Sequence, residues 1–453
     1  MTLPVLGVIL FALLGLPLFC VLSSLGLFGL HHGQSPLMGA ITEVYSLAGD
    51  KADAFLTIPL FTFAGYLMAS AKTAQRLIRM AETILGWIPG GLAVMTVLTC
   101  AFFTTFTGAS GVTIVAVGGL ILPALEKSRY SKRFSLEVVT GSGAVGLLFP
   151  PSLPIIIYAT VFGLTYGNFS KGMENVAEFS MGRFLFAGIV PGLLLVGLLI
   201  IYCIIEGWRS KVPRNPIDLR GFGKSLWEAK WEIPVPFVVI GMLNSGIADP
   251  FEAAALTALY IFVIEVFVYR DIQLRNLFAI ARESMTLFGA IFVKIMGALI
   301  LTAFFVDSGV PQALFEWMGQ FVHSSWTFLL VMNAVLLLVG CLMDIFSAIV
   351  VVVPLIVPAA ATFHIDPYHL GVIFLLNLEI GYLLPPAGLN LFIAAFRFNR
   401  PIVDLYRAVI PFILIMFAAL MLVTYIPKLT VVPAGEERPA PALEQGMEAA
   451  PGP

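Results

Sequence analysis

The chain has 453 residues, of which 59% are hydrophobic and only 11% are charged. The mean hydropathy is +0.97, whereas an ordinary soluble domain carries about 25% charged residues, so the composition excludes a soluble globular protein. A net charge of −2 excludes the basic surface of a nucleic-acid binder. We therefore predict an all-α polytopic membrane protein that lies in the lipid bilayer and has no nucleic-acid partner.

Apolar stretches along the chain predict about 11–12 transmembrane segments, because one membrane-spanning helix needs about 20 mostly apolar residues. Residues 3–30 are interpreted as a retained first span, since the basic flank and cleavage site of a signal peptide are missing. The remaining uninterrupted candidates are residues 52–71, 86–106, 184–205, 233–247, 251–269, 285–305, 326–343 and 409–426. Residues 72–82 and 211–231 mix charged with apolar residues, which favours helices that lie at the membrane surface.

Four further stretches do not fit simple spans. Residues 108–125 and 344–362 begin with polar residues and end at a proline followed by small residues, which favours re-entrant hairpins. Residues 136–162 and 370–396 are long but are interrupted by a Pro-Pro pair, which predicts two broken helices.

The Pro-Pro stretch occurs twice. Pro123 and Pro150 have the same separation as Pro358 and Pro385, and a glycine stands four positions before each Pro-Pro pair. The shift that takes Pro150 to Pro385, here called the repeat offset, therefore also takes the other matched residues of the first half to their counterparts in the second. Leucine and alanine matches are expected by chance in apolar sequence, but prolines and glycines in register are not. We therefore predict two inverted repeats, each with a hairpin and a broken helix.

Such repeats are typical of secondary transporters, which bind substrate and ion near the membrane midplane where broken helices meet. Proline removes a backbone donor and frees a carbonyl one turn back, so Pro150 and Pro385 could each help to expose carbonyl oxygens to a small cation. The alternative for each pair is a kink that serves packing alone.

The segment 106–113 is small and polar within an apolar context and is typical of a hairpin tip. Glycine permits a tight turn there, and the hydroxyls of Ser110 and Thr113 can act as ligands. The alternative is a close crossing of two helices, which small residues also allow.

Polar residues in the second half of the chain are candidate ligands of a coupling ion. Asp344 and Ser347 open the second hairpin, and an ionisable residue within a span is a functional candidate because its insertion is costly. Asn377 and Glu379 precede the second Pro-Pro pair, and Asn390 follows it. Glu379 could instead form a structural pair. Sodium prefers oxygen ligands, as hard cations do.

Lys294 lies in the middle of an apolar segment. It could neutralise an anionic substrate, or it could reach the interface or pair with Asp307 or Glu252.

Two enzyme classes are excluded by missing motifs. The chain has no Walker A sequence for nucleotide hydrolysis and no His-Glu-x-x-His motif of a metalloprotease. We therefore expect a protein that is not an enzyme.

Over nearly its whole length the chain resembles the large membrane subunit of tripartite ATP-independent periplasmic (TRAP) transporters, of the dicarboxylate type. The most specific matches are in the C-terminal half: Asp344 with Pro354 and Pro358, residues 365–367, residues 377–381, and residues 385–392. In the first half, residues 58–65, 90–93, 108–111 and 150–154 resemble the corresponding family segments.

The resemblance implies an elevator-type, sodium-coupled importer of an organic acid in the bacterial inner membrane. Its implied partners are a small four-helix membrane subunit, a periplasmic substrate-binding protein and a small-molecule organic anion, and Na+ is the implied coupling ion. Residues 1–432 would form the permease, with transport elements at about 86–166 and 326–397 and scaffold elsewhere, and residues 433–453 a disordered tail. The residues expected to contact the substrate are Gly108, Ala109, Ser110, Gly111, Ser152 and Asn390. The residues expected to hold the ion are Ser110, Thr113, Pro150, Asp344, Ser347, Asn377, Glu379, Gly381 and Pro385.

Three positions depart from the family pattern. An acidic residue commonly follows the first hairpin's Gly-Ser, where this chain has residues 114–116, Ile-Val-Ala. Leu384 stands where threonine often precedes the second Pro-Pro pair, and Phe149 precedes the first. These departures leave the number of sodium sites open. The carboxylate carried and the orientation of the termini also stay open, as do two alternatives. These are a stand-alone sodium–carboxylate symporter without a binding protein, and a membrane enzyme or scaffold.

Overall fold

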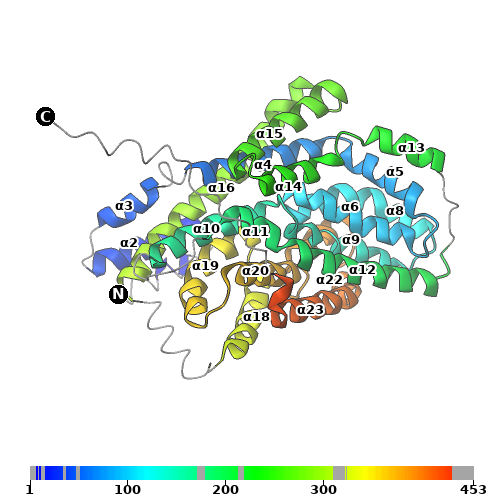
Figure 1. The fold of residues 1–453 in the computed structure, drawn as a ribbon. Helices are drawn as coiled ribbons and strands as arrows, with labels where there is room; N and C mark the ends of the chain where they lie inside the picture. The colour runs from blue at the N-terminus through cyan, green and yellow to red at the C-terminus, as the bar shows by residue number, and fades with distance from the viewer. Residues whose placement is uncertain are drawn as a thin grey trace.

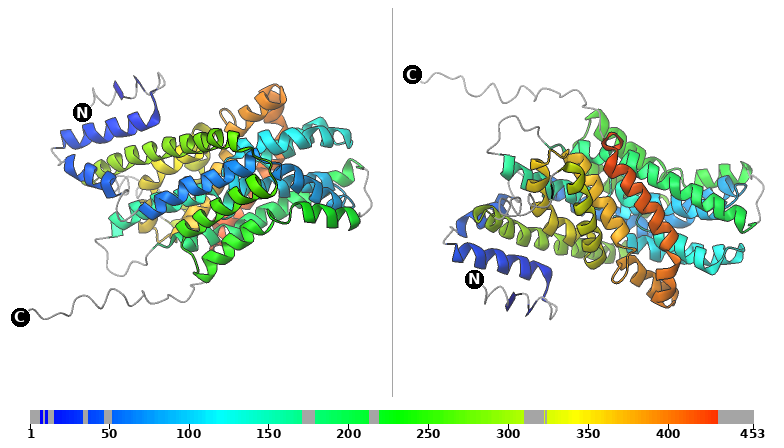
Figure 2. Two further views of the ribbon diagram at one scale, coloured as in Figure 1. Left: turned by 90° about the horizontal axis from the view of Figure 1, so that it is seen from above. Right: turned by 90° about the horizontal axis from the view of Figure 1, so that it is seen from below.

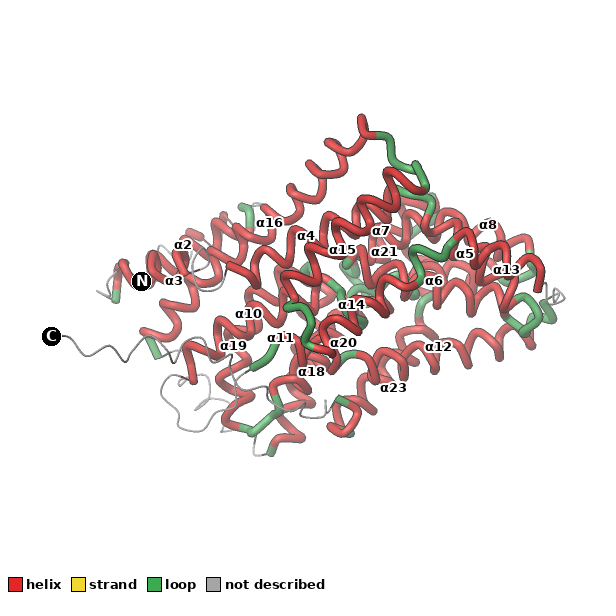
Figure 3. The backbone as a smooth tube through the Cα atoms, turned by 45° about the horizontal axis from the view of Figure 1, so that its top comes forward, coloured by secondary structure: helices red, strands yellow, loops and turns green. Residues whose placement is uncertain are grey.

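The computed structural model describes residues 7–8, 10–11, 16–33, 37–46, 52–170, 179–212, 219–309, 322 and 324–430. All regular secondary structure in these ranges is helical, which confirms the all-α class (Figure 3). The expected disordered tail at residues 433–453 and most of the stretch before residue 16 lie outside the described residues.

Helices of the first half can be followed from blue to green in Figure 1. In order they are α2 (Leu18–His32), α3 (Leu37–Ser46), α4 (Ala52–Ser70), α5 (Thr73–Leu85), α6 (Gly91–Thr107), α7 (Ser110–Thr113), the π-helix η1 (Ile114–Gly118), α8 (Gly119–Lys127), α9 (Lys132–Gly141), the 3₁₀ turn η2 (Val145–Leu148), α10 (Leu153–Ser170), α11 (Met181–Ala187) and α12 (Ile189–Arg209).

Helices of the second half run from green to red in the same view. In order they are α13 (Leu219–Glu228), α14 (Pro234–Ser245), α15 (Pro250–Val263), the π-helix η3 (Ile264–Val268), α16 (Leu274–Asp307), α18 (Ser325–Leu342), α19 (Ile345–Thr362), α20 (Pro367–Gly381), α21 (Leu389–Phe398), α22 (Ile402–Ala408), α23 (Ile410–Tyr425) and the 3₁₀ turn η4 (Pro427–Leu429).

The described residues contain six helices long and apolar enough to cross a membrane, or nine if each bent pair is counted as one span. The polytopic class is thus confirmed, but the number of long spans is below the predicted 11–12. Four further helices of the described ranges, α2, α6, α14 and α21, are apolar but only 10–17 residues long. At one end of the molecule α2 and α3 pack on α16 (Figure 2).

The structure extends the repeat beyond the matched prolines. The continuous helix Ser110–Lys127 and α19 each contain 18 residues, and the repeat offset takes the first and last residues of one to those of the other. The helices that follow begin after capping residues at Ser131 and Asp366, which also correspond. The Ser131 side chain accepts a hydrogen bond from the N–H of Phe134, and Asp366 accepts from the N–H groups of the first turn of α20. Such side-chain oxygens satisfy donors that a helix start leaves free.

The predicted composition of the hairpins is wrong. Residues 108–125 and 344–362 were each expected to form a whole hairpin, but each forms one helical arm with the turn at its N-terminal end. The other arm of the first hairpin is α6, which turns at Gly108–Ala109 into the helix Ser110–Lys127. The other arm of the second is α18, which turns at Met343–Asp344 into α19. An uninterrupted 18-residue apolar run is long enough for a single helix, so the turn falls at the polar residues.

Glycines allow each broken helix to approach the first arm of its own hairpin. A Cβ built at Gly146 would lie 2.1 Å from the carbonyl oxygen of Ala101 in α6. A Cβ at Gly381 would lie 2.5 Å from the carbonyl carbon of Gly340 in α18. Both contacts are with backbone, which cannot move aside easily, so the predicted glycine match has a packing reason.

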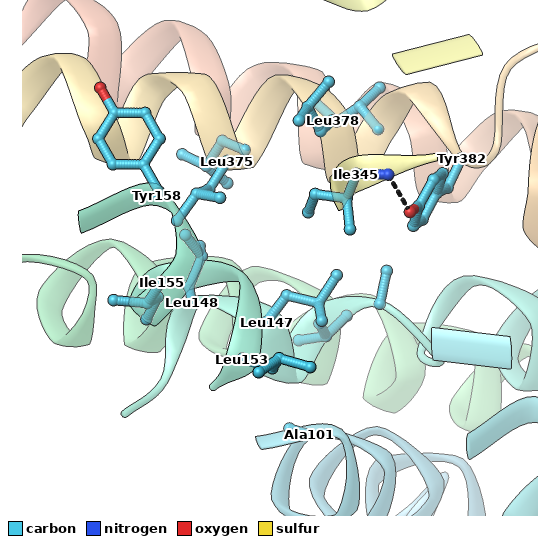
Figure 4. Close-up of a cluster of buried hydrophobic side chains, with 14 of the residues drawn as sticks. Ala101, Leu147, Leu148, Leu153, Ile155, Tyr158, Ile345, Leu375, Leu378 and Tyr382 are labelled. Atoms are coloured by element: carbon cyan, nitrogen blue, oxygen red, sulfur yellow. Dashed lines mark hydrogen bonds between the residues drawn. The ribbon is translucent and has the colours of Figure 1, made fainter. Parts of the chain in front are cut away.

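The two broken helices also pack on each other. Leu148 and Tyr158 of the first lie opposite Leu375 and Leu378 of the second in one apolar cluster (Figure 4), and all four are buried. This cluster places the helical segments that lead into both Pro-Pro pairs in the interior of the molecule, where lipid cannot reach their backbone groups.

A buried ion cluster holds α5 against the segments around α14 and α15. The guanidinium of Arg76 donates to Glu232 (2.5 and 2.9 Å), to Asp271 (2.6 Å) and to Glu265 (3.2 Å). The side chains of all four are at most 7% exposed. Removal of one partner from such a cluster leaves an uncompensated buried charge, which is strongly destabilising.

We predict that Gly381→Ala lowers the free energy of unfolding by roughly 1–3 kcal/mol, the usual cost of overpacking. Gly197→Ala in α12 is the control, because a Cβ there meets nothing within 4 Å and alanine favours a helix. Thermal unfolding of the purified protein in detergent measures both. Equal melting temperatures for the two variants would contradict the packing role of Gly381.

Candidate functional site

A cavity of about 620 Å³ lies where the tips of both hairpins meet α4 and α16. Its lining is small or apolar on the first hairpin and includes hydroxyl and carboxyl groups elsewhere. The lining residues are Tyr66, Ala69, Ser70, Gly108, Ala109, Ser110, Gly111, Val112, Val115, Ala116, Glu283, Asp344, Ile345, Phe346, Tyr382, Leu389 and Ile393. Both repeats therefore contribute to one site.

The predicted tip of the first hairpin lies in this cavity. Gly108 ends α6 with a φ of +59°, and a Cβ there would lie 2.4 Å from Cβ of Leu153. A side chain at this position would be both strained and obstructed, so the turn requires glycine. The four expected contact residues Gly108–Gly111 all line the cavity.

A hydrogen bond joins the tip of the first hairpin to the second broken helix. The Ser110 hydroxyl donates to Oδ1 of Asn390 at 2.7 Å, and both side chains are buried. Nδ2 of Asn390 has no hydrogen-bond partner within the described ranges. In Figure 3, α7 and α21 lie side by side, and they are also in contact. Ser110 and Asn390 thus belong to one site, although they come from opposite halves of the chain.

Three helices begin at the cavity. Ser110, Ile345 and Leu389 are their first residues, and all three line it. A helix N-terminus carries a partial positive charge and free N–H groups, which attract anions. The helix that begins at Ile345 is capped by Asp344, whereas those that begin at Ser110 and Leu389 have no side-chain cap. The geometry therefore offers two uncapped positive helix ends to a ligand.

Asp344 and Ser347 both lie at the start of α19, and Lys294 of α16 contacts both. Asp344 accepts hydrogen bonds from the N–H and the hydroxyl of Ser347. Lys294 of α16 donates to the Ser347 hydroxyl at 2.8 Å and to Oδ2 of Asp344 at 3.3 Å. The ion-pair partner of Lys294 is Asp344 rather than Asp307 or Glu252, the two partners considered from the sequence. Asp344 faces the cavity with its charge balanced by Lys294.

A cluster of hydroxyls and carbonyls lies behind the first tip. The hydroxyl of Thr113 lies 2.7 Å from that of Thr104 and 3.4 Å from that of Thr107. Thr104 donates to the carbonyl of Gly143 at 2.8 Å. Thr105 donates to the carbonyl of Ala101 in its own helix at 2.8 Å and lies 3.3 Å from the carbonyl of Gly146. All four threonines are buried. The predicted tip segment 106–113 included Thr107 and Thr113, but Thr104 and Thr105 were missed, since threonines in an apolar arm look like ordinary helix residues.

The surroundings of the two Pro-Pro pairs differ. Pro150 and Ser152 are buried and do not line the cavity, and the Ser152 hydroxyl donates to the carbonyl of Leu147. Pro385 is exposed, and its carbonyl accepts a hydrogen bond from the thiol of Cys341 at 3.1 Å. Carbonyls near both pairs thus have protein donors in this arrangement.

Asn377, Glu379 and Gly381 are buried residues in the C-terminal part of α20 and do not line the cavity. Asn377 donates to Oδ1 of Asn333 at 2.7 Å and to the carbonyl of Ile373 at 2.8 Å. Gly381 packs on Gly340, as described above. Both carboxyl oxygens of Glu379 are buried and have no hydrogen-bond partner in the described part of the chain, which is costly for a charged carboxylate. These three predicted ion ligands are therefore not among the residues that line the cavity.

Sequence reasoning missed the scaffold side of the cavity. Tyr66 and Ser70 come from α4 and Glu283 comes from α16. The hydroxyl of Tyr382 accepts a hydrogen bond from the N–H of Ile345 at 2.6 Å (Figure 4). No repeat or spacing marks the scaffold residues, because they come from helices outside the repeats.

The family model of the tripartite ATP-independent periplasmic transporter, DctM component, matches residues 5–429. The chain belongs to this family. It is a large permease subunit of this family. Its relatives and its apolar helices identify it as a multi-pass protein of the bacterial inner membrane. Its relatives are named as transporter permeases, in agreement with the expectation that it is not an enzyme.

Two relatives and one solved structure show the extent of the similarity. The C4-dicarboxylate TRAP transporter large permease protein DctM of Rhodobacter capsulatus is 36% identical over 83% of this chain and 86% of its own length. The isethionate TRAP transporter permease protein DctMQ of Oleidesulfovibrio alaskensis is 34% identical over 87% of this chain, which spans 60% of that protein. The fold is similar to that of the YdaH transporter of Alcanivorax borkumensis, with a TM-score of 0.63 at 15% identity, covering 93% of this chain and 97% of that one.

We predict that Ser110 and Asn390 of the permease are energetically coupled. Ser110→Ala and Asn390→Leu should each lower stability, because each leaves a buried polar group without its partner. The double variant should be more stable than the sum of the single losses implies, by about 1 kcal/mol. Thermal unfolding of the three variants measures this coupling, and strictly additive losses would show that the bond has no effect.

Proposed function

We propose that this permease imports a small organic anion together with sodium, by movement of the two hairpins and broken helices against the remaining helices. The observation that carries the proposal is the single cavity at which both hairpin tips and three helix N-termini meet. A site built from both repeats and bounded by other helices is the arrangement that alternating access needs.

An anionic substrate is supported by the electrostatics of the cavity. The uncapped helix ends at Ser110 and Leu389 offer N–H groups to a carboxylate or sulfonate. The charge of Asp344 is balanced by Lys294. Glu283, the other carboxylate on the wall, has no ion-pair partner among the described residues, so its charge acts against an anion while the helix ends attract it. The two named substrates of the relatives above, a C4-dicarboxylate and isethionate, are both anions, which makes an organic acid the expected class.

Sodium is supported by the oxygen cluster behind the first tip. The hydroxyls of Thr104, Thr107 and Thr113 and the carbonyls of Gly143 and Gly146 are the neutral oxygen ligands that a hard cation uses. Such ligands without a carboxylate suit a monovalent ion. Asp344, Ser347 and the buried Glu379 are further candidate ligands in the second repeat, which requires that Asp344 and Ser347 leave their present partners.

The partners proposed for this permease are a small four-helix membrane subunit and a periplasmic substrate-binding protein, as expected for the family. The alternative is a stand-alone sodium–carboxylate symporter. Uptake that is equal with and without a periplasmic binding protein would favour that alternative.

We predict that sodium chloride raises the melting temperature of the purified permease more than potassium chloride does, because a ligand that binds the folded state stabilises it. Thr113→Val should raise the sodium concentration for half-maximal stabilisation about tenfold, which corresponds to about 1.4 kcal/mol.

Thr96→Val is the matched control. Thr96 is a buried threonine of α6 whose hydroxyl donates to the carbonyl of Leu92 in its own helix, at 2.8 Å. The control should keep the sodium dependence of the unmodified protein. Identical half-saturation concentrations for Thr113→Val and Thr96→Val would remove the threonine cluster as the sodium site.

A further inference from the structure

One ion pair connects a helix outside the repeats to the second hairpin. The ammonium of Lys294 in α16 donates to the Ser347 hydroxyl at 2.8 Å and to Oδ2 of Asp344 at 3.3 Å. Both acceptors belong to the start of α19, and the described residues give the Lys294 ammonium no other hydrogen bond. Asp344 lines the cavity, so this contact lies at the edge of the proposed site.

Lys294 is too deep in α16 to reach water along the helix. Within the apolar segment 285–305 of this helix, Lys294 lies about 14 Å from the first residue and about 17 Å from the last, at about 1.5 Å per residue. A lysine side chain cannot extend over that distance. An ammonium at this depth needs an anion or a wet cavity beside it, and Asp344 provides the anion in the state described here.

The first hairpin offers no equivalent partner. At the repeat offset, Asp344 corresponds to Ala109 and Ser347 corresponds to Val112. Lys294 can therefore form this ion pair with the second hairpin but not with the first. The pair stabilises the position of the second hairpin against α16 that is seen here.

We propose that Lys294 is a positioning residue that holds the second hairpin in the arrangement seen here and releases it when the transport elements move. The proposal rests on the elevator-type movement in the proposed function. Both acceptors lie on the element that moves, so any displacement of α19 along α16 separates them from the ammonium.

The exposure of the pair suits a contact that breaks in every cycle. The side chains of Lys294 and Asp344 are 22% and 37% exposed, and a partly solvated pair is weak. The Arg76 cluster is the opposite case, because its side chains are at most 7% exposed and one guanidinium contacts three carboxylates. That cluster joins scaffold segments to each other and is a permanent contact.

The test measures which side of the membrane the cavity opens to, without substrate. Val115→Cys places a reporter on the first hairpin, at an exposed cavity position outside the proposed binding residues. Its labelling by a membrane-impermeant maleimide is measured from each side of oriented membranes that contain the whole complex. The same protein without the reporter gives the background of the native cysteines.

Lys294→Met should change the ratio of the two labelling rates about threefold or more, the shift expected from loss of a partly exposed ion pair. Lys294→Arg, which retains the charge, should restore the ratio of the unmodified protein. Ser347→Ala removes the shorter hydrogen bond and keeps both charges, so it should shift the ratio in the same direction and serves if Lys294→Met does not fold. Lys72→Met is the control, because Lys72 is an exposed scaffold lysine whose ammonium pairs with Asp271.

If Lys294→Met and Ser347→Ala lower the melting temperature but leave the ratio of the two labelling rates unchanged, the proposal is overturned. The ion pair would then stabilise the fold without affecting which side the cavity opens to. A shift in Lys294→Arg as large as in Lys294→Met would overturn it as well, since charge would then not matter. Labelling needs neither substrate nor sodium. If the ratio of labelling rates shifts but the complex shows no sodium-driven uptake, the role proposed for Lys294 stands and the proposed function is refuted.

Discussion

A helix within a bilayer can be interrupted only where the polar backbone groups at the break are enclosed by protein or open into a wet cavity. This constraint governs the structure. The segments that lead into the Pro-Pro pairs lie inside the molecule, where α6 and α18 approach them closely at Gly146 and Gly381. The turns at Gly108 and Asp344 open into the cavity instead. Enclosed segments and open turns together bring the ends of several helices to one place, which an uninterrupted bundle cannot do.

The two repeats share a backbone arrangement but differ in chemistry. In the first, Thr104 and Thr113 place hydroxyls behind the hairpin tip, whereas their counterparts in the second are Val339 and Ala348. The second repeat has Asp344 at its tip, where the first has Ala109. The first repeat is therefore suited to a cation held by neutral oxygens, and the second to a charged contact with α16. This division follows the departure seen in the sequence, where the first hairpin lacks an acidic residue.

Much of the fold follows from local sequence, because apolar length and proline position determine where helices run and break. The repeat offset, found from Pro150 and Pro385, also describes the bounds of the hairpin arms and the capping residues Ser131 and Asp366. The hairpin tip at Gly108 was predictable, since small and polar residues interrupt the apolar stretch there. The pairing of the arms was not, because an apolar run such as α6 looks the same whether it spans the membrane or returns in a hairpin.

The composition of the site was only partly predictable. The tip residues Gly108–Gly111 line the cavity, whereas Asn377 and Glu379 are buried elsewhere in the protein. This difference depends on which face of an apolar helix meets which neighbour. The contacts between Ser110 and Asn390 and between Lys294 and Asp344 join residues that are far apart in the sequence. A single sequence contains no signal for such pairs, since they arise from tertiary packing of the repeats and the scaffold.

Uptake by the complete complex tests the central claim most directly. The permease, its small subunit and its binding protein are reconstituted in vesicles, and accumulation of a labelled C4-dicarboxylate or other carboxylate that the binding protein binds is followed. An inward sodium gradient should drive accumulation above the outside concentration, and dissipation of that gradient should abolish it. Equal accumulation with and without the gradient would contradict sodium-coupled import.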